Sequence, residues 1–117
     1  MNSIEDLREA LLAFRDARDW AQFHSLRNLI VSLNLEAAEL LELTQWKRDD
    51  EIAALASDPA QRTALADECA DVLLYLILVA DAAGINLLAA ARDKLAKNAA
   101  KYPVDKARGR SDKYDRL

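Results

Sequence analysis

The stretch ECADVLLYLILV, residues 68–79, decides the fold of this chain. Residues 72–79 would be apolar on every side of a helix, and a helix of that kind has to be buried all round. Pro59 suits a first helical position and Gly84 suits the residue after a helix end, which predicts one long helix over about 59–83. A second copy of so small a chain is the simplest cover for this helix. The alternative is the central helix of a monomeric bundle.

The composition predicts an all-α protein. The 117 residues include only two Gly and two Pro, and 52% are hydrophobic and 31% charged. Such a composition favours helices over sheets and argues against disorder. The length suits one domain spanning residues 1–117, with a basic tail at about 102–117. We therefore expect a four-to-five-helix bundle whose core is completed by oligomerisation.

Charge and cysteine content argue against several classes of protein. The formal net charge of −4 does not favour non-specific binding of nucleic acid. Cys69 is the only cysteine, so no internal disulfide can form and a reducing compartment fits. The first residues lack the basic and then apolar pattern of a signal peptide. The apolar run 72–80 is about half as long as a membrane span. We expect a cytoplasmic protein without membrane or nucleic-acid partners.

Three further long helices are predicted. They extend from about Ser3 to Arg18, from Ser25 to Lys47 and from Asn86 to Lys101. Each begins at a Ser or Asn whose side chain can cap a helix. Residues 49–58 allow one short helical turn, and Pro103 ends the last helix.

Residues 19–24, DWAQFH, break the helical period and hold two aromatic residues and the only histidine. Trp20 and Phe23 either plug the core or form a wall of a ligand pocket, because aromatic side chains stack on planar nucleobases. His24 alone does not decide between these interpretations, since a lone histidine is more often structural.

Two pairs of carboxylates interrupt the apolar stripes of the second and third helices. They are Glu36 with Glu39, and Glu68 with Asp71. Each pair has a spacing of three residues, which places both members on one helical face. Carboxylates on core-facing stripes are unfavourable unless a cation or hydrogen bonds compensate them. Mg²⁺ takes oxygen ligands and helps to hold phosphates, so we predict a Mg²⁺ site built from these four residues.

The two pairs resemble the signature of the all-α nucleoside triphosphate pyrophosphohydrolases, the MazG-like group. Its Glu-x-x-Glu and Glu-x-x-Asp elements read EAAE at 36–39 and ECAD at 68–71. The closer likeness is to the dCTP pyrophosphatase branch. It is carried by DWAQFH at 19–24, RNL at 27–29, LTQWK at 43–47, DVLLYL at 71–76, KYP at 101–103 and RSDKY at 110–114. It covers nearly the whole chain except residues 48–60.

The resemblance implies roles for individual residues. Mg²⁺ would be bound by Glu36, Glu39, Glu68 and Asp71. The positions that match the nucleoside pocket are Trp20, His24, Trp46, Tyr75 and Asn98. The positions that would face the phosphates are Lys94, Lys101, Arg110, Lys113 and Tyr114. The resemblance also implies a homo-oligomer, either a dimer or a tetramer formed from two dimers.

The implied reaction converts a dNTP and water into a dNMP and pyrophosphate, with dCTP or a modified dCTP as substrate, and so removes unwanted nucleotides from the pool. Metal ions neutralise the triphosphate and lower the pKa of water, and Glu39, or else Glu36, takes the proton of that water. Two features depart from the family pattern. Asn34 and Ala38 stand where glycines are common, which crowds the metal helix, and Leu11 stands near a position where the dCTP branch can carry a histidine. The second difference leaves strict selection of cytosine open.

Three other functions are considered. A broad-specificity or dUTP-directed pyrophosphohydrolase of the same family would share all four ligands. A non-catalytic helical interaction module would need the acids to lie on solvated faces. A di-iron carboxylate bundle requires Glu-x-x-His pairs, and His24 lies outside both acidic pairs.

Overall fold

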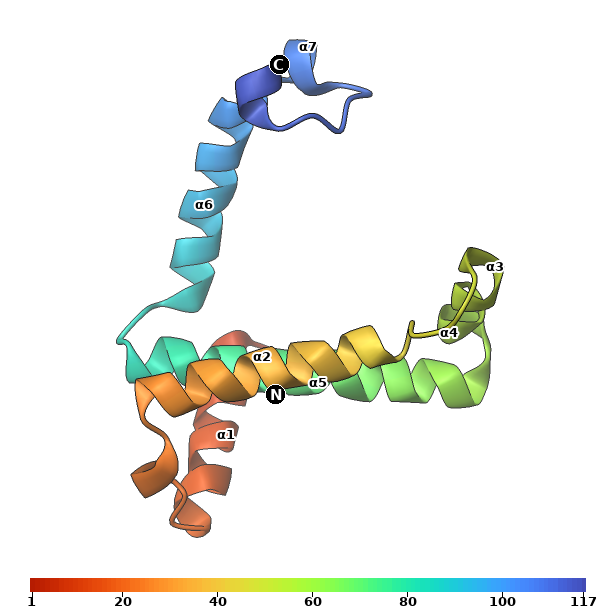
Figure 1. Ribbon diagram of the computed structural model, residues 1–117. Coiled ribbons are helices and arrows are strands. Elements are labelled where there is room, and N and C mark those ends of the chain that lie inside the picture. The colour runs from red at the N-terminus through yellow and green to blue at the C-terminus, as the bar shows by residue number, and fades with distance from the viewer. The chain divides into compact units, whose positions relative to one another are not determined.

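Helices α2 (Leu26–Glu42) and α5 (Pro59–Ala82) lie side by side and form the centre of the first of two compact units, Met1–Gly84 and Ile85–Leu117 (Figure 1). The computed structural model describes all residues from Met1 to Leu117 and contains helices and no strand. No single helix is long and apolar enough to cross a membrane. The two units are described separately, and the single domain expected over residues 1–117 stays a prediction.

The first unit contains the longest helices of the chain. Its elements are α1 (Ile4–Ala17), the 3₁₀ turn η1 (Ala21–Phe23), α2, α3 (Asp49–Ile52), α4 (Ala54–Ser57) and α5. The predicted capping residues begin the first two long helices: Ser3 Oγ accepts from the backbone N–H of Asp6 at 3.0 Å, and Ser25 Oγ from that of Asn28 at 3.1 Å. These bonds satisfy backbone donors that the first helical turn leaves free.

The core of this unit lies between α2 and α5 near the C-terminal part of α5. Its buried hydrophobic residues are Leu29, Ile77, Leu78 and Ala80, and Leu55 on α4 is buried separately, near the beginning of α5. Within the single chain only Ile77 and Leu78 of residues 72–79 are buried and Leu73 is 37% exposed, so burial of this helix on every side against a second copy stays a prediction. Within one chain, α1 and α2 do not cover the whole circumference of α5.

Two boundaries differ from the prediction. Helix α2 ends at Glu42 rather than near Lys47. The N–H of Thr44 bonds to the carbonyl of Leu41 at 2.9 Å and tightens the last turn, and Trp46 adopts a left-handed φ of 64°, which no α-helix can continue. Residues 49–58 form two short helices, α3 and α4, instead of one turn. Gly84 has the left-handed φ of 68° expected after the end of α5.

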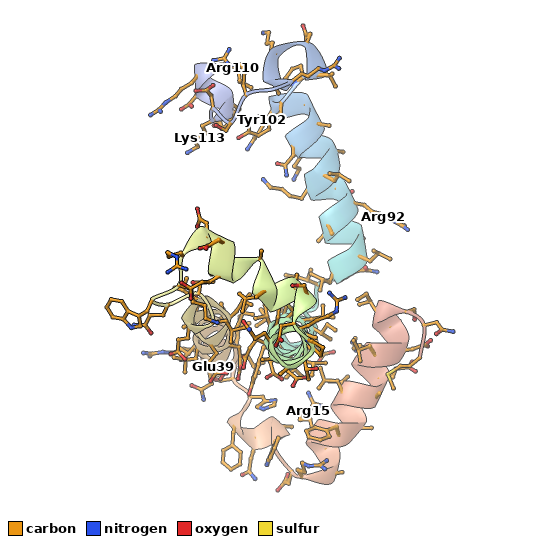
Figure 2. The ribbon with its side chains drawn as sticks, turned by 90° about the vertical axis from the view of Figure 1, so that its right-hand side faces the viewer. Arg15, Glu39, Arg92, Tyr102, Arg110 and Lys113 are labelled. Carbon is orange, nitrogen blue, oxygen red and sulfur yellow. The ribbon has the colours of Figure 1, made fainter.

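The second unit is built on α6 (Leu87–Lys101), which Asn86 caps through a 3.0 Å bond from the N–H of Ala89. The basic tail that follows contains a short helix α7 (Val104–Ala107) and a 3₁₀ turn η2 (Tyr114–Arg116). The rings of Tyr102 and Tyr114 meet edge to face, with centroids 6.3 Å apart. Figure 2 shows Tyr102, Arg110 and Lys113 at the same end of α6. The tail therefore folds back toward the last turn of α6.

Candidate active site

Three carboxylates from the two central helices form one cluster. Glu36 and Glu39 come from α2 and Glu68 comes from α5, and one oxygen from each lies within 4.8 Å of the others. The three-residue spacing turns both α2 residues toward one side, where α5 lies alongside. Glu39 is labelled in Figure 2, in a view along the axes of these helices. The structure thus brings together three of the four carboxylates that the sequence singles out, and their role as metal ligands stays a prediction.

The cluster is electrostatically unfavourable by itself. Burial, together with the nearby carboxylate of Glu39, raises the pKa of both Glu36 and Glu68, and the charge of Asp71 acts in the same direction. The Oε2 atoms of Glu36 and Glu68 are buried and have no hydrogen-bond partner. A buried acceptor without a donor destabilises the folded state. The cluster therefore needs either protons or a cation.

The donor set fits a hard divalent cation. All donors are carboxylate oxygens, which Mg²⁺ and Ca²⁺ prefer, and the cluster contains neither His nor Cys. Oxygens that share one such ion, with bonds of about 2.1–2.5 Å, are at most about 5 Å apart. The oxygens of Glu36, Glu39 and Glu68 lie within 4.8 Å of one another, which fits the longer bonds to Ca²⁺, and small side-chain rotations would bring them within the roughly 4.2 Å that bonds of about 2.1 Å to Mg²⁺ allow.

Asp71, the fourth predicted ligand, has a different position. It lies one turn after Glu68 on α5, is partly buried, and lines a pocket beside the cluster. Its charge acts, after burial and the carboxylate of Glu39, to raise the pKa of Glu36 and Glu68. Asp71 therefore stands at the junction between the carboxylate cluster and the pocket.

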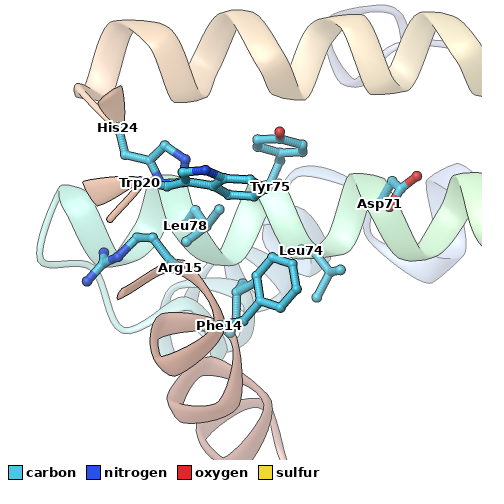
Figure 3. A pocket seen from close by; sticks show the side chains of 9 residues that line it. Phe14, Arg15, Trp20, His24, Asp71, Leu74, Tyr75 and Leu78 are labelled. Atoms are coloured by element: carbon cyan, nitrogen blue, oxygen red, sulfur yellow. The ribbon is translucent and has the colours of Figure 1, made fainter. Parts of the chain in front are cut away.

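The pocket has a volume of about 200 Å³ and is lined mainly by apolar and aromatic side chains (Figure 3). Its lining residues are Leu11, Phe14, Arg15, Trp20, His24, Asp71, Leu74, Tyr75 and Leu78. Three residues predicted to contact the nucleoside, Trp20, His24 and Tyr75, come together here, and Figure 3 shows them near one another beside α5. The Nδ1 atom of His24 is buried and has no hydrogen-bond partner within the chain.

The side chain of Trp20 contacts Phe14 on α1 and lies near Arg18, which follows that helix. The rings of Phe14 and Trp20 meet edge to face with centroids 5.7 Å apart. The guanidinium carbon of Arg18 lies 3.7 Å from the centroid of Phe14 and 6.0 Å from that of Trp20. Such contacts hold an aromatic ring at little entropic cost on ligand binding.

Trp46 does not line this pocket. Its side chain is 93% exposed, in the loop after α2. Lys47 Nζ lies 3.5 Å from Oε1 of Gln61, which places the loop beside the first turns of α5. Ten residues of helix separate Gln61 from Asp71, about 15 Å at the rise of an α-helix. The predicted substrate contact of Trp46 therefore finds no support within one chain.

The remaining predicted residues lie in the second unit. Lys94, Asn98 and Lys101 share one face of α6 by their spacing. Lys101 Nζ lies 4.9 Å from the ring centroid of Tyr114. Arg110 Nε donates to Oδ2 of Asp112 at 3.0 Å, and its Nη2 donates to the carbonyl of Arg116 at 3.3 Å. Lys113 is exposed. Contact of these residues with phosphate stays a prediction.

Several lining residues carried no signal of a site in the sequence. Phe14, Leu74 and Leu78 are indistinguishable from core positions in an apolar helical stripe, and Arg15 has no motif. In the sequence, Leu11 is distinguished only as a departure from the family pattern. Its place in the pocket wall could have been inferred from that departure.

Comparison with known proteins identifies the family. Residues 31–117 match the MazG-like family. The chain belongs to the MazG-like family. Among curated relatives, dCTP pyrophosphatase 1 of Bos taurus is 41% identical over 115 residues, or 98% of this chain and 68% of that protein. The Mus musculus protein of the same name is 42% identical over 115 residues, which are 98% of this chain and 68% of that protein.

A solved structure of a similar protein agrees in fold. The crystal structure of a pyrophosphatase from Archaeoglobus fulgidus has 42% sequence identity and a TM-score of 0.77. The alignment covers 85% of this chain and 91% of that chain. The predicted MazG-like membership and all-α class are therefore confirmed.

Proposed function

We propose that this MazG-like protein is a nucleoside triphosphate pyrophosphohydrolase that converts a dNTP and water into a dNMP and pyrophosphate, with dCTP or a modified dCTP as the preferred substrate. One observation carries the proposal: the cluster of Glu36, Glu39 and Glu68 adjoins an aromatic pocket, and Asp71 stands between them. The names of the curated relatives support the same reaction and base. The physiological role is removal of unwanted nucleotides.

The proposed cofactor is Mg²⁺. Glu36, Glu39 and Glu68 would hold it, with Asp71 as the fourth ligand, because their buried oxygens lack other partners. When bound, the cation supplies positive charge that neutralises the triphosphate and favours ionisation of water. It also removes the repulsion among the carboxylates that raises the pKa of Glu36 and Glu68.

Glu39 is the proposed general base. It is the exposed member of the cluster, whereas Glu36 and Glu68 are partly buried, so its free carboxylate oxygen is accessible to an attacking water. It accepts the proton of that water as the water attacks phosphorus. Glu36, one turn away on α2, is the second choice. Most of the rate comes from positioning and charge neutralisation, as in other phosphoryl transfers.

The pocket would take the base and sugar and leave the triphosphate outside. Its volume of about 200 Å³ is below the roughly 300–1,000 Å³ of pockets that enclose drug-sized ligands. Trp20 and Tyr75 offer aromatic faces for stacking, which every base accepts, while His24 offers a polar atom for selection.

One observation favours the broad-specificity or dUTP-directed alternative. Leu11 lines the pocket, so its position presents methyl groups and no side-chain hydrogen-bond donor or acceptor. A site discriminates strongly between two bases only when binding of the wrong base leaves one of the site's own buried polar groups without a hydrogen bond. Selection of cytosine over uracil would then depend on the few polar side-chain groups of the lining, among them those of His24 and Tyr75.

Phosphate contacts are proposed for the second unit. Lys94 and Lys101 lie on one face of α6, and the tail adds Arg110, Lys113 and Tyr114. Basic and hydrogen-bonding groups of this kind recognise phosphate oxygens. Asn98, on the same face of α6, is the proposed nucleoside contact from this unit.

A homo-oligomer, either a dimer or a tetramer of two dimers, is part of the proposal. Apolar side chains remain exposed on the central helices: Leu26, Ile30, Val31, Leu35, Leu41 and Leu73 are between 37% and 69% exposed. Exposed apolar surface on this scale is typical of a protein interface. We also propose a cytoplasmic location, which suits the free, exposed thiol of Cys69.

The decisive experiment is a panel of dNTPs and NTPs with Mg²⁺, in which release of pyrophosphate is scored against release of orthophosphate. The proposal predicts pyrophosphate and the fastest turnover with dCTP or 5-substituted dCTP. Turnover of dUTP alone would favour the alternative substrate, and release of orthophosphate from every nucleotide would contradict the reaction. The oligomer is tested by light scattering on the purified protein.

A further inference from the structure

Helix α1 is joined to the end of α5 by a small ion cluster. Arg8 donates from Nε and Nη2 to Oδ1 of Asp81, at 2.9 and 2.7 Å. Arg15 Nη1 lies 3.8 Å from the other oxygen, Oδ2. The side chains of Asp81 and Arg15 are only 19% and 20% exposed, so water screens this cluster less than an ordinary surface ion pair.

The same helix forms one wall of the pocket. Leu11, Phe14 and Arg15 from α1 face residues 71–78 of α5 across it. Figure 3 shows the stem of Arg15 beside Leu78, with its guanidinium directed away from the middle of the pocket. Arg15 thus belongs to the pocket through its apolar stem and to the ion cluster through its charged end.

Apolar packing alone holds α1 weakly. None of its residues is buried, and Phe14 is 47% exposed. The pocket wall therefore depends on polar contacts for its position. Asp81 is the only residue outside α1 that forms an ion pair with that helix.

We propose that Asp81 is a positioning residue for the nucleoside pocket: by binding Arg8 and Arg15, it sets the separation of α1 from α5 at which a base fits between them. This inference rests on the proposed function. Asp81 lies ten residues after Asp71, about 15 Å along the helix, so it touches neither the carboxylate cluster nor the bound phosphates. Its loss should weaken binding of the nucleoside and leave binding of metal and polyphosphate unchanged.

The test compares two ligands on the full chain. Calorimetry measures the Kd of dCMP, which requires the nucleoside pocket, and inhibition by inorganic tripolyphosphate with Mg²⁺ measures the phosphate site. In Asp81→Asn we expect the Kd of dCMP to rise about three- to tenfold, which is about 0.6–1.4 kcal/mol and lies in the range of the net contribution of a typical hydrogen bond. The inhibition constant of tripolyphosphate should stay within about twofold of the parent value, a difference of only about 0.4 kcal/mol. Asp81→Glu, which keeps the charge, should restore at least part of the affinity for dCMP.

Two further variants separate positioning from general stability. Arg8→Gln disrupts the same ion cluster by a change on α1. It should also weaken the binding of dCMP, and it replaces Asp81→Asn if that variant does not fold. Asp50, on α3, has the same charge and forms an exposed ion pair with Arg48. Asp50→Asn should change neither the Kd of dCMP nor the inhibition constant of tripolyphosphate. Hydrogen exchange should become faster in residues 4–17 of Asp81→Asn and stay unchanged around Glu39.

Three outcomes would overturn the inference. Unchanged affinity for dCMP in Asp81→Asn refutes the role of Asp81, and equal weakening of dCMP and tripolyphosphate shows a general structural role instead. A parent protein that binds neither ligand refutes the proposed function and this inference with it. The first two results leave the proposed function intact.

Discussion

Glu36 on α2 and Glu68 on α5 face one cluster, and each keeps a buried carboxylate oxygen, Oε2, without a hydrogen-bond partner. Two carboxylates in this arrangement destabilise the metal-free protein, because burial and the nearby Glu39 raise the pKa of both. The contacts that favour folding are therefore made elsewhere, in the core around Ile77 and Leu78. The cluster gains a stabilising role only when a cation joins its members.

The first prediction follows from this repulsion. Glu68→Gln should raise the melting temperature of the protein in EDTA, because it removes one charge from the cluster. In the parent protein, Mg²⁺ at about 100 times its Kd should add about 2.7 kcal/mol to the free energy of unfolding, and Glu68→Gln should lose most of that gain. Differential scanning fluorimetry with and without Mg²⁺ measures both effects. Glu42→Gln, a change on α2 outside the cluster, is the matched control. A lower melting temperature of Glu68→Gln in EDTA would show that the carboxylate is stabilising.

The second prediction concerns pH. Folding raises the pKa of Glu36 and Glu68, so the folded metal-free protein holds more protons than the unfolded chain. Their contribution to stability is fully present below the unfolded pKa and is lost as the pH rises through the raised folded pKa. Mg²⁺ competes with these protons. The rise in melting temperature caused by Mg²⁺ should therefore grow between about pH 5 and about pH 8.

The double variant Glu36→Gln/Glu68→Gln isolates these groups from all other titrating residues. Its melting temperature in EDTA should fall less steeply with rising pH than that of the parent. If the melting temperatures of parent and variant change with pH in the same way, the pKa values of Glu36 and Glu68 are not raised by folding.

The third prediction tests the general base. Glu39→Gln keeps the size of the side chain and removes its basicity, so turnover of dCTP should fall by about 10²–10⁴-fold. The Kd of dCMP should not change, because Glu39 does not line the pocket. Stopped assays of pyrophosphate release and calorimetry measure the two quantities. If Glu39→Gln turns over dCTP within a few-fold of the parent rate, Glu39 is not the general base and Glu36 becomes the candidate.

The fourth prediction concerns stacking in the pocket. Trp20→Ala should weaken dCMP binding by about 1–3 kcal/mol, the cost of removing an aromatic side chain that stacks on a base, and should leave the inhibition constant of tripolyphosphate unchanged. Phe23→Ala is the matched control, since Phe23 is in the same turn η1, is 62% exposed and does not line the pocket. Equal loss in the two variants would indicate damage to η1 rather than stacking.

Local signals in the sequence predicted most of the helices. Ser3, Ser25 and Asn86 cap the helices that they were expected to cap, because a capping residue acts within three positions of itself. The three-residue spacing of Glu36 and Glu39 likewise predicted a shared face. The predicted end of α2 was wrong. Residues 43–47, LTQWK, include good helix formers, and no neighbouring residue indicates that the backbone of Trp46 is left-handed.

Features that depend on distant residues were not predictable. Arg8 and Asp81 are 73 positions apart, and nothing near either residue indicates the other. Leu11 and Arg15 meet Leu78 only because α1 crosses α5 at one particular place. A single sequence carries no record of such crossings, whereas the family pattern indicated Trp20, His24 and Tyr75, which do share the pocket.

The fifth prediction concerns Trp46. An indole that is 93% exposed and held by a left-handed backbone contributes little to the stability of a single chain. Trp46→Ala should therefore leave the unfolding of the isolated chain unchanged. If the homo-oligomer brings this residue to the pocket of a second copy, Trp46→Ala should raise the KM for dCTP by about tenfold. This factor lies within the range expected when one aromatic side chain that stacks on a base is lost. Mixing Trp46→Ala with the inactive Glu39→Gln should then restore part of the activity, because one of the mixed sites combines a parental Glu39 with a parental Trp46. Mixed oligomers that show no more than the sum of the separate activities would place Trp46 outside the site.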